Sequence, residues 1–377
     1  MRSLSDTLQR LAALQGRPDA VQHTARLDRL SDLRDFGSNP GALRARFYVP
    51  PRLEPGAPLV VVLHGCTQDA AGYDHGSGWS RLSDEYGFAV LFPEQQRANN
   101  ANLCFNWFNR EDTRRNSGEA LSIRQMIAAM ADAHRLDAAR IYVTGLSAGG
   151  AMTSVMLATY PEVFAGGAII AGLPFGTAAS VPEAFDRMRA HGGPRAAALG
   201  ELVAAASDHR GPWPTISVWH GSSDATVAPL NADLVVEQWR GLHGVAPEGV
   251  VESELGAGYT RRAWRDADGR EVIEEYRIAG LGHGTPLASS GPDACGIPGP
   301  YMLEAGVSST RRIAGFWGLI RAAPSRAASD LAMAAGPPAA ARAERLPTGG
   351  KDAPPRLPDG GVGRVIEDAL RAAGLMR

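Results

Sequence analysis

Ser147 lies in Gly145-Leu146-Ser147-Ala148-Gly149-Gly150, a G-x-S-x-G motif that presents a hydroxyl group on a sharp turn. Segment 140–144, RIYVT, is strand-like and leads into the motif, and a helix is expected at 151–160. Strand, turn and helix form the context this motif needs, and small neighbours are required because the serine backbone is strained there. We therefore interpret Ser147 as the nucleophile of an acyl-transfer reaction. The competing interpretation is a glycine-rich turn with a surface serine.

A serine hydroxyl becomes a good nucleophile when a histidine takes its proton and a carboxylate holds that histidine. With this motif the order along the chain is serine, acid, histidine. His283 stands on a small-residue loop directly after a strand-like segment, and Asp224 follows the strand-like segment 215–219. These positions predict Asp224 as the acid and His283 as the base. The alternatives with poorer placement are Asp208 and Asp233 for the acid and His209, His220 and His243 for the base.

The oxyanion of such a reaction needs two backbone N–H donors. Ala148 N–H, directly after the nucleophile, is expected to be one of them. The second is expected from the loop 64–68, with Cys66 N–H as the preferred candidate. His64 in the same loop is predicted to brace it by hydrogen bonds rather than to act as a base.

Apolar runs alternate with helical patterns along the middle of the chain. The strand-like runs are 58–63, 88–92, 140–144, 166–171 and 215–219, and 119–134 has helical spacing. Alternation of this kind predicts a mostly parallel sheet with helices on both faces, and with the G-x-S-x-G turn it predicts an α/β-hydrolase fold. Two helical stretches within 173–212 interrupt the alternation and predict a small cap-like excursion. Segments 259–265 and 271–278 flank a turn and predict a hairpin.

Four parts are expected along the 377 residues. Residues 1–39 form a lead-in with a short helix at 3–15, and 40–321 form the catalytic domain. Residues 322–361 are rich in Ala, Pro and Gly, as is typical of a linker, and 362–377 regain helical spacing.

Composition excludes several other classes of protein. The net charge is −2 with no basic run, so no nucleic-acid partner is expected, and no apolar stretch approaches 18 residues, so no membrane span is expected. Histidines and cysteines do not cluster at ligand spacing, so neither a metal site nor another cofactor is predicted. Three cysteines leave room for one disulfide and one free thiol.

Several motifs together resemble the poly(3-hydroxybutyrate) depolymerase family of esterases over residues 40–320. They are LHGCTQ at 63–68, FPEQ at 92–95, the Asn pair at 99–100, NWF at 106–108, GLSAGGAM at 145–152 and PGPYM at 298–302. The resemblance implies hydrolysis of poly- or oligo-3-hydroxyalkanoate esters, with Ser147, Asp224 and His283 as the triad. It also implies a disulfide between Cys66 and Cys104, whereas the residues alone are equally consistent with two buried thiols.

Family members with other substrates provide an alternative function, a feruloyl or acetylxylan-type esterase. A non-catalytic granule-binding protein with the same fold is a remote alternative, which an intact triad disfavours. The resemblance implies an extracellular protein, but residues 1–20 hold no apolar run of seven, so no signal peptide is predicted and a cytoplasmic location stays open. Oligomeric state is not predicted.

Aromatic residues could line an apolar substrate groove. Trp107 is the strongest candidate because it lies in a loop near the expected site, and Trp79 and Tyr73 are weaker ones. For each of them the alternative is an ordinary place in the hydrophobic core.

Overall fold

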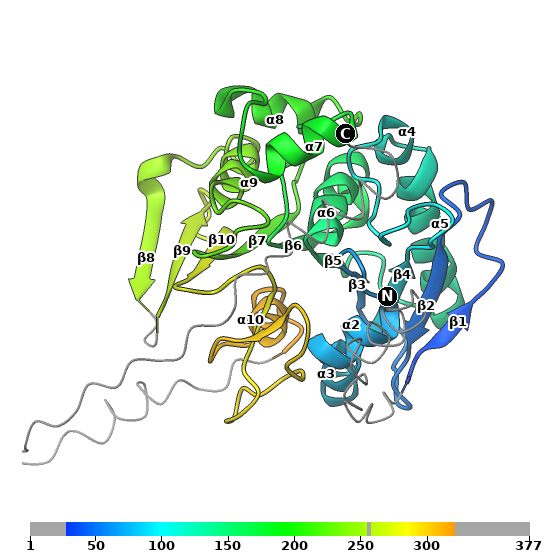
Figure 1. The fold of residues 1–377 in the computed structure, drawn as a ribbon. Coiled ribbons are helices and arrows are strands. Elements are labelled where there is room, and N and C mark those ends of the chain that lie inside the picture. The colour runs from blue at the N-terminus through cyan, green and yellow to red at the C-terminus, as the bar shows by residue number, and fades with distance from the viewer. Residues whose placement is uncertain (1–27, 255–257, 321–377) are drawn as a thin grey trace, which may run out of the picture.

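A computed structural model describes residues 28–254 and 258–320 (Figure 1). The predicted helix at 3–15, the linker at 322–361 and the terminal helix at 362–377 lie outside the described residues. Within the described part, no helix combines the length and the apolar character needed to cross a membrane.

A ten-stranded sheet runs through the described part, in the order β1-β2-β4-β3-β5-β6-β7-β10-β9-β8. The strands from β4 to β10 in this order are parallel to one another, and both edges are antiparallel. The strands are β1 Ser31–Leu33, β2 Arg44–Tyr48, β3 Leu59–Leu63, β4 Ala89–Glu94, β5 Ile141–Leu146, β6 Gly166–Ile170, β7 Thr215–Gly221, β8 Val250–Glu254, β9 Tyr259–Arg265 and β10 Glu271–Ile278. A separate parallel pair is formed by β11 Thr285–Leu287 and β12 Met302–Glu304.

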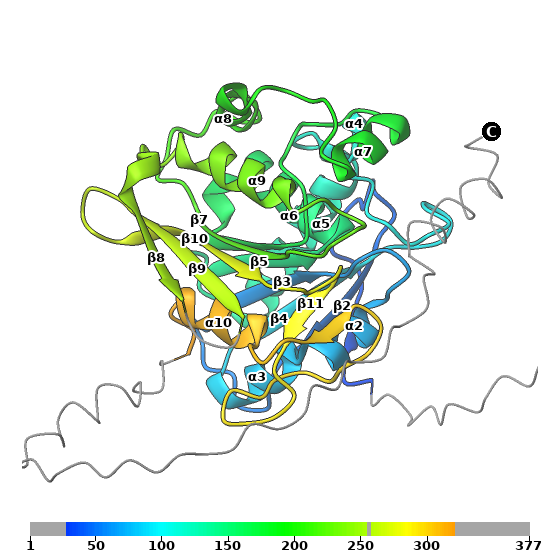
Figure 2. The same cartoon turned by 60° about the vertical axis from the view of Figure 1, so that its left-hand side comes forward.

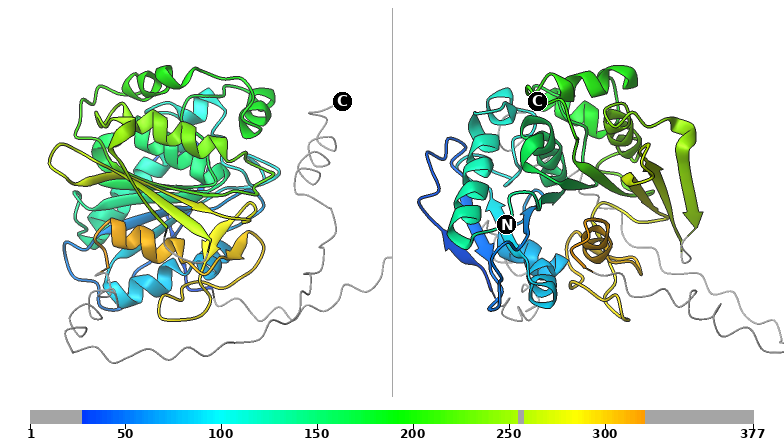
Figure 3. Two further views of the ribbon diagram at one scale, coloured as in Figure 1. Left: turned by 90° about the vertical axis from the view of Figure 1, so that its left-hand side faces the viewer. Right: turned by 180° about the vertical axis from the view of Figure 1, so that it is seen from behind.

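Helices cover both faces of the sheet (Figure 2). One layer holds α4 to α9, and the opposite layer holds α2, α3 and α10; the edge-on view in Figure 3 shows the same separation. The helices are α2 Ala70–Ser77, α3 Trp79–Tyr86, α4 Arg110–Thr113, α5 Gly118–His134, α6 Ala148–Thr159, α7 Val181–Met188, α8 Ala196–Ala204, α9 Leu230–Arg240 and α10 Ser309–Phe316, with short 3-10 turns at Pro161–Val163 and Pro247–Gly249.

The apolar runs of the central strands follow from this layering. In β3, Leu59, Val61 and Leu63 belong to the core under α5 and α6, whereas Val60 and Val62 belong to the core on the other face. Successive side chains of a strand point to opposite faces, so a strand covered on both sides is apolar at every position. The α/β-hydrolase fold is thus the one predicted.

The antiparallel strands at the edge of the sheet were predicted only in part. The expected hairpin is confirmed as β9 and β10, and β8 extends it by one antiparallel strand. The excursion at 173–212 contains α7 and α8, which lie in the same layer as α9 (Figure 2). The loops that carry the candidate site all follow carboxyl ends of parallel strands, namely β3, β5, β7 and β10.

Candidate active site

Ser147 occupies the sharp turn between β5 and α6. Its φ of 57° and ψ of −116° lie outside the usual conformations of a non-glycine residue, and its N–H donates to Ile170 O at 2.9 Å. A Cβ on Gly145 would lie 2.4 Å from the Gly149 backbone, and one on Gly149 would lie 2.3 Å from Leu63 O. The glycines of the motif are therefore required because α6 begins against the backbones of β3 and β5.

Asp224 and His283 meet across two loops, as the sequence order predicts. His283 Nδ1 lies 2.7 Å from Asp224 Oδ2, and the two side chains follow the adjacent parallel strands β7 and β10. Asp224 Oδ1 accepts from Thr226 N at 2.8 Å and from Val227 N at 2.9 Å. Because the carboxylate is held on both oxygens, it can fix the plane of the His283 ring.

The ionised form of Asp224 is strongly favoured. Burial opposes ionisation, but hydrogen bonds from His220 and His283, together with the charge of His283 and the Val227 N–H, outweigh it and lower the pKa of Asp224 well below its usual range. An ionised carboxylate accepts from His283 Nδ1, so the proton of a neutral His283 ring is on Nδ1 and Nε2 is free to accept another.

The loops of Asp224 and His283 are tied together through their backbones. A Cβ on Gly221 would lie 2.2 Å from Leu281 O, so only glycine permits this approach. Ser222 N donates to Ile278 O at 2.9 Å, and Ser223 N donates to Leu281 O at 3.0 Å. These contacts explain why the small residues around both functional side chains are needed.

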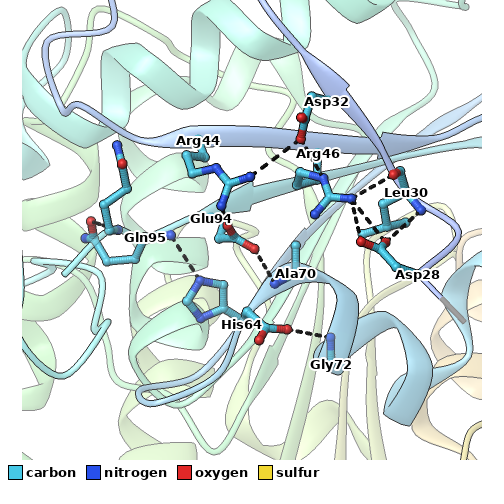
Figure 4. Close-up of polar contacts among 12 residues, drawn as sticks. Asp28, Leu30, Asp32, Arg44, Arg46, His64, Ala70, Gly72, Glu94 and Gln95 are labelled. Carbon is cyan, nitrogen blue, oxygen red and sulfur yellow. Dashed lines mark hydrogen bonds and ion pairs between the residues drawn. The ribbon is translucent and has the colours of Figure 1, made fainter. Parts of the chain in front are cut away.

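The loop after β3 is braced as predicted. Gln95 N–H donates to His64 Nε2 at 3.1 Å (Figure 4), so the ring proton is on Nδ1, which donates to Gly65 O at 2.8 Å. Burial lowers the pKa of His64, which keeps the ring neutral. His64 is thus a structural residue of this loop and has both ring nitrogens occupied.

A disulfide joins Cys66 of this loop to Cys104, with a Cα–Cα distance of 4.2 Å. A backbone hydrogen bond of 2.7 Å from Thr67 N to Asn102 O links the same two loops. Within the described residues, neither Cys66 N–H nor Ala148 N–H donates to a protein acceptor. Both donors are therefore available to an external oxygen.

Ser147 and His283 open onto one cavity of about 330 Å³, which Cys66, Ala148 and Trp107 also line. Asp224 is behind His283 and does not line the cavity. Five amide side chains lie along the cavity: Gln68, Asn99, Asn100, Asn102 and Asn106. Apolar side chains line the rest, mainly Trp107, Phe108, Leu173, Val181, Ala184, Phe185, Met188 and Val227.

Two of the predicted groove residues are elsewhere. Trp79 and Tyr73 are buried in the core beneath α2, α3 and α10, where Trp79 stacks on Trp317 at 6.0 Å and Tyr73 Oη lies 3.1 Å from Thr285 Oγ1. The prediction for these two residues is wrong, because α2 and α3 pack their aromatic side chains against the sheet. The ordinary core interpretation holds for both.

Sequence reasoning missed most of the cavity lining. Val181, Phe185 and Met188 come from α7, in the segment expected to be a cap, but no motif marks them. Tyr301 also lines the cavity, with its ring centroid 6.3 Å from that of His283. The parallel pairing of Thr285 with Met302 brings it there. In the sequence, Tyr301 belongs to the PGPYM motif, which contributed to the family resemblance but was given no role in the site.

The buried carboxylate of Glu119 organises the loop that carries Trp107. It accepts from Gln95 Nε2 at 2.6 Å, from Asn106 N at 2.9 Å and from Asn106 Nδ2 at 2.9 Å. Asn100 Nδ2 in turn donates to Asn106 Oδ1 at 3.0 Å. The amides along the cavity are thus largely engaged with the protein itself.

Comparisons with known proteins show which families and structures this chain resembles. The sequence model of the family described as Esterase PHB depolymerase matches residues 43–262. Poly(3-hydroxyalkanoate) depolymerase C of Paucimonas lemoignei is 47% identical over 77% of this chain and 70% of its own length. Acetylxylan esterase A of Aspergillus oryzae is 32% identical over 62% of this chain and 79% of its own. The solved acetyl xylan esterase from Aspergillus awamori superposes with a TM-score of 0.64 at 25% identity, over 77% of this chain and 99% of its own.

Proposed function

Because the chain belongs to the Esterase PHB depolymerase family and is a carboxylic ester hydrolase, we propose that it cleaves poly- or oligo-3-hydroxyalkanoate esters through an acyl-enzyme on Ser147. The observation that carries the proposal is the shared cavity. It presents the strained Ser147, the Asp224-bound His283 and the unpaired N–H groups of Cys66 and Ala148 to one space.

Acylation begins when His283 Nε2 takes the proton of Ser147 as Oγ attacks the ester carbonyl carbon. The carbonyl oxygen becomes an oxyanion, which the N–H groups of Cys66 and Ala148 stabilise. The carbon–oxygen bond of the ester then breaks. His283 returns the proton to the departing oxygen, which leaves as the hydroxyl end of the remaining chain.

Deacylation repeats these steps with water as the nucleophile. His283 takes a proton from water, the new oxygen bonds to the acyl carbon, and Ser147 leaves with the proton returned by His283. The product carries a free carboxylic acid. Throughout, Asp224 stays ionised and stabilises the imidazolium that forms twice in each turnover.

The cavity lining favours a polyester over an acetylated polysaccharide. Each repeat of a 3-hydroxyalkanoate carries an alkyl branch, for which the apolar side of the cavity along α7 offers contacts. Sugar rings need many free donors and acceptors. The amides of Asn99, Asn100 and Asn106 already donate to protein oxygens, at 2.8 Å to Gly41 O, 3.0 Å to Asn106 Oδ1 and 2.9 Å to Glu119 Oε1.

Two substrates and two serine variants test the proposal. The purified protein should release 3-hydroxybutyrate and its short oligomers from amorphous poly(3-hydroxybutyrate) faster than acetate from acetylxylan, as read by mass spectrometry. Ser147→Ala should lose more than about a thousandfold in kcat and all labelling by a fluorophosphonate. Ser290→Ala, at an exposed serine away from the cavity, is the matched control and should behave as wild type.

Each arm has a result that contradicts the proposal. Retained turnover in Ser147→Ala would exclude the acyl-enzyme. Preferred release of acetate would move the substrate to the polysaccharide esters while leaving the mechanism in place.

A further inference from the structure

A second histidine contacts the Asp224 carboxylate. His220 Nε2 lies 3.3 Å from Asp224 Oδ2, the same oxygen that His283 Nδ1 approaches at 2.7 Å. His220 Nε2 also lies 2.9 Å from Val227 O. The His220 side chain is almost fully buried, and it does not line the cavity. It therefore contacts the catalytic machinery without reaching the substrate.

The two neighbours of His220 Nε2 fix its proton. A carbonyl oxygen and a carboxylate oxygen are both acceptors, so Nε2 must carry hydrogen and donate to them. The ring has little freedom to turn, because the His220 side chain is only 2% exposed. The N–H thus lies 2.9 Å from Val227 O, its main acceptor, and 3.3 Å from Asp224 Oδ2, measured from Nε2.

Across the sheet from His220, the neighbouring charged groups of the described residues pair with one another. Arg277, the cross-strand neighbour of His220, contacts Asp233 of α9 and Glu275 of β10. Arg262 of β9 contacts the same two carboxylates. Asp224 and His283 are therefore the titratable partners that His220 faces from the loops after β7 and β10.

We infer that His220 is a positioning residue for the reaction proposed above: its Nε2–H, shared with Val227 O, also donates to the Asp224 carboxylate that holds His283. The bond keeps Oδ2 directed at His283 Nδ1. It also offsets part of the carboxylate charge that acts on the His283 ring while that ring takes the proton of Ser147 and returns it to the departing oxygen.

Two substitutions separate the hydrogen bond from the volume of the ring. His220→Phe keeps a ring but removes the donor, whereas His220→Gln places an N–H group the same number of bonds from the backbone. On p-nitrophenyl butyrate, His220→Phe should lower kcat about tenfold with KM nearly unchanged. Because the ionised Asp224 carboxylate loses one donor, its charge acts more strongly on His283, and the acidic limb of the kcat/KM profile should move to higher pH by about half a unit. His220→Gln should restore most of the rate and the wild-type limb.

The outcomes are distinct. The inference is overturned if His220→Phe has wild-type kcat and pH profile, or if both variants lose rate equally with an unmoved limb, which indicates structure alone. Ser147→Ala, measured alongside, reports separately on the proposed function. Nitrogen-15 NMR of histidine-labelled wild-type protein covers the case in which His220→Phe does not fold. An Nε2–H tautomer that persists in the fluorophosphonate adduct supports the role, and an Nδ1–H tautomer refutes it.

Discussion

Replacement of Asp224 by asparagine tests the reaction scheme by exchanging one carboxylate oxygen for an NH2 group. The carboxylate accepts from the backbone N–H groups of Thr226 and Val227 on one oxygen, at 2.8 and 2.9 Å, and from His283 on the other, which His220 Nε2 also approaches at the longer distance of 3.3 Å. Asparagine has a single oxygen, and the two backbone donors hold it on their side. Its NH2 group must then face His283 Nδ1, which has to accept, so the ring proton moves to Nε2.

With its proton on Nε2, His283 cannot take the proton of Ser147. A change of this kind in a serine–histidine–aspartate site costs about four powers of ten in kcat, or about 5.5 kcal/mol of transition-state stabilisation. Asp224 does not line the cavity, so KM should change little. The expected signature is thus a loss in kcat alone.

Initial rates on p-nitrophenyl butyrate across pH 5–9 measure this effect. Asp208→Asn makes the same chemical change at an exposed aspartate outside the cavity, and it should leave kcat unaltered. If Asp224→Asn stayed within about tenfold of wild type, the tautomer argument would be refuted. The acid would then have to be sought elsewhere.

Three further predictions concern stability. Replacing both Cys66 and Cys104 by alanine opens a loop with a sequence separation of 38, and it should lower the unfolding free energy by about 4 kcal/mol in urea titrations, against an unchanged value for Ser290→Ala. Burial and then the charge of Asp112 raise the pKa of Glu119 to about 8, so the folded state keeps a proton that the unfolded state releases above its ordinary pKa of 4.5. Stability from this group is complete below that value and is lost at about 1.4 kcal/mol per pH unit up to pH about 8. Glu119→Gln cannot titrate, so the unfolding free energy of wild type minus that of the variant, from urea titrations at several pH values, should fall with this slope. A difference that does not vary with pH would refute the prediction. Gly149→Ala should prevent folding because its Cβ meets Leu63 O, whereas Gly241→Ala, at a helical φ of −61° with open space around it, should raise the melting temperature slightly; equal effects of the two would contradict the packing argument.

The sequence predicted the parts of the molecule that follow from local pattern. Apolar runs identified β3 to β7 because a strand covered on both faces cannot alternate with polar residues. Order and loop chemistry singled out Ser147, Asp224 and His283 as the proposed triad, since the motif constrains where its partners can follow, and the structure brings Asp224 into contact with His283. Short edge strands such as β1 and β8 escaped because they are partly exposed and carry charges.

The lining of the cavity could not be predicted in the same way. Val181, Phe185 and Met188 are ordinary apolar positions of a helix, and only the placement of α7 over Ser147 gives them a role. His220 was set aside as a base because it precedes the acid in the chain. Its contact with Asp224 depends on the turn between them, which a spacing of four residues does not reveal.

The bridge between Cys66 and Cys104 has a consequence for how this enzyme can change. It fastens Cys66, whose N–H we propose binds the oxyanion, to the loop that carries Trp107, so a mutation that reshapes the cavity from that loop is expected to change the rate of reaction as well. Within the described residues, no disulfide links α7 to the loops that carry Ser147 and His283. New acyl preferences are therefore expected to arise by drift in α7, where selectivity and turnover can vary independently.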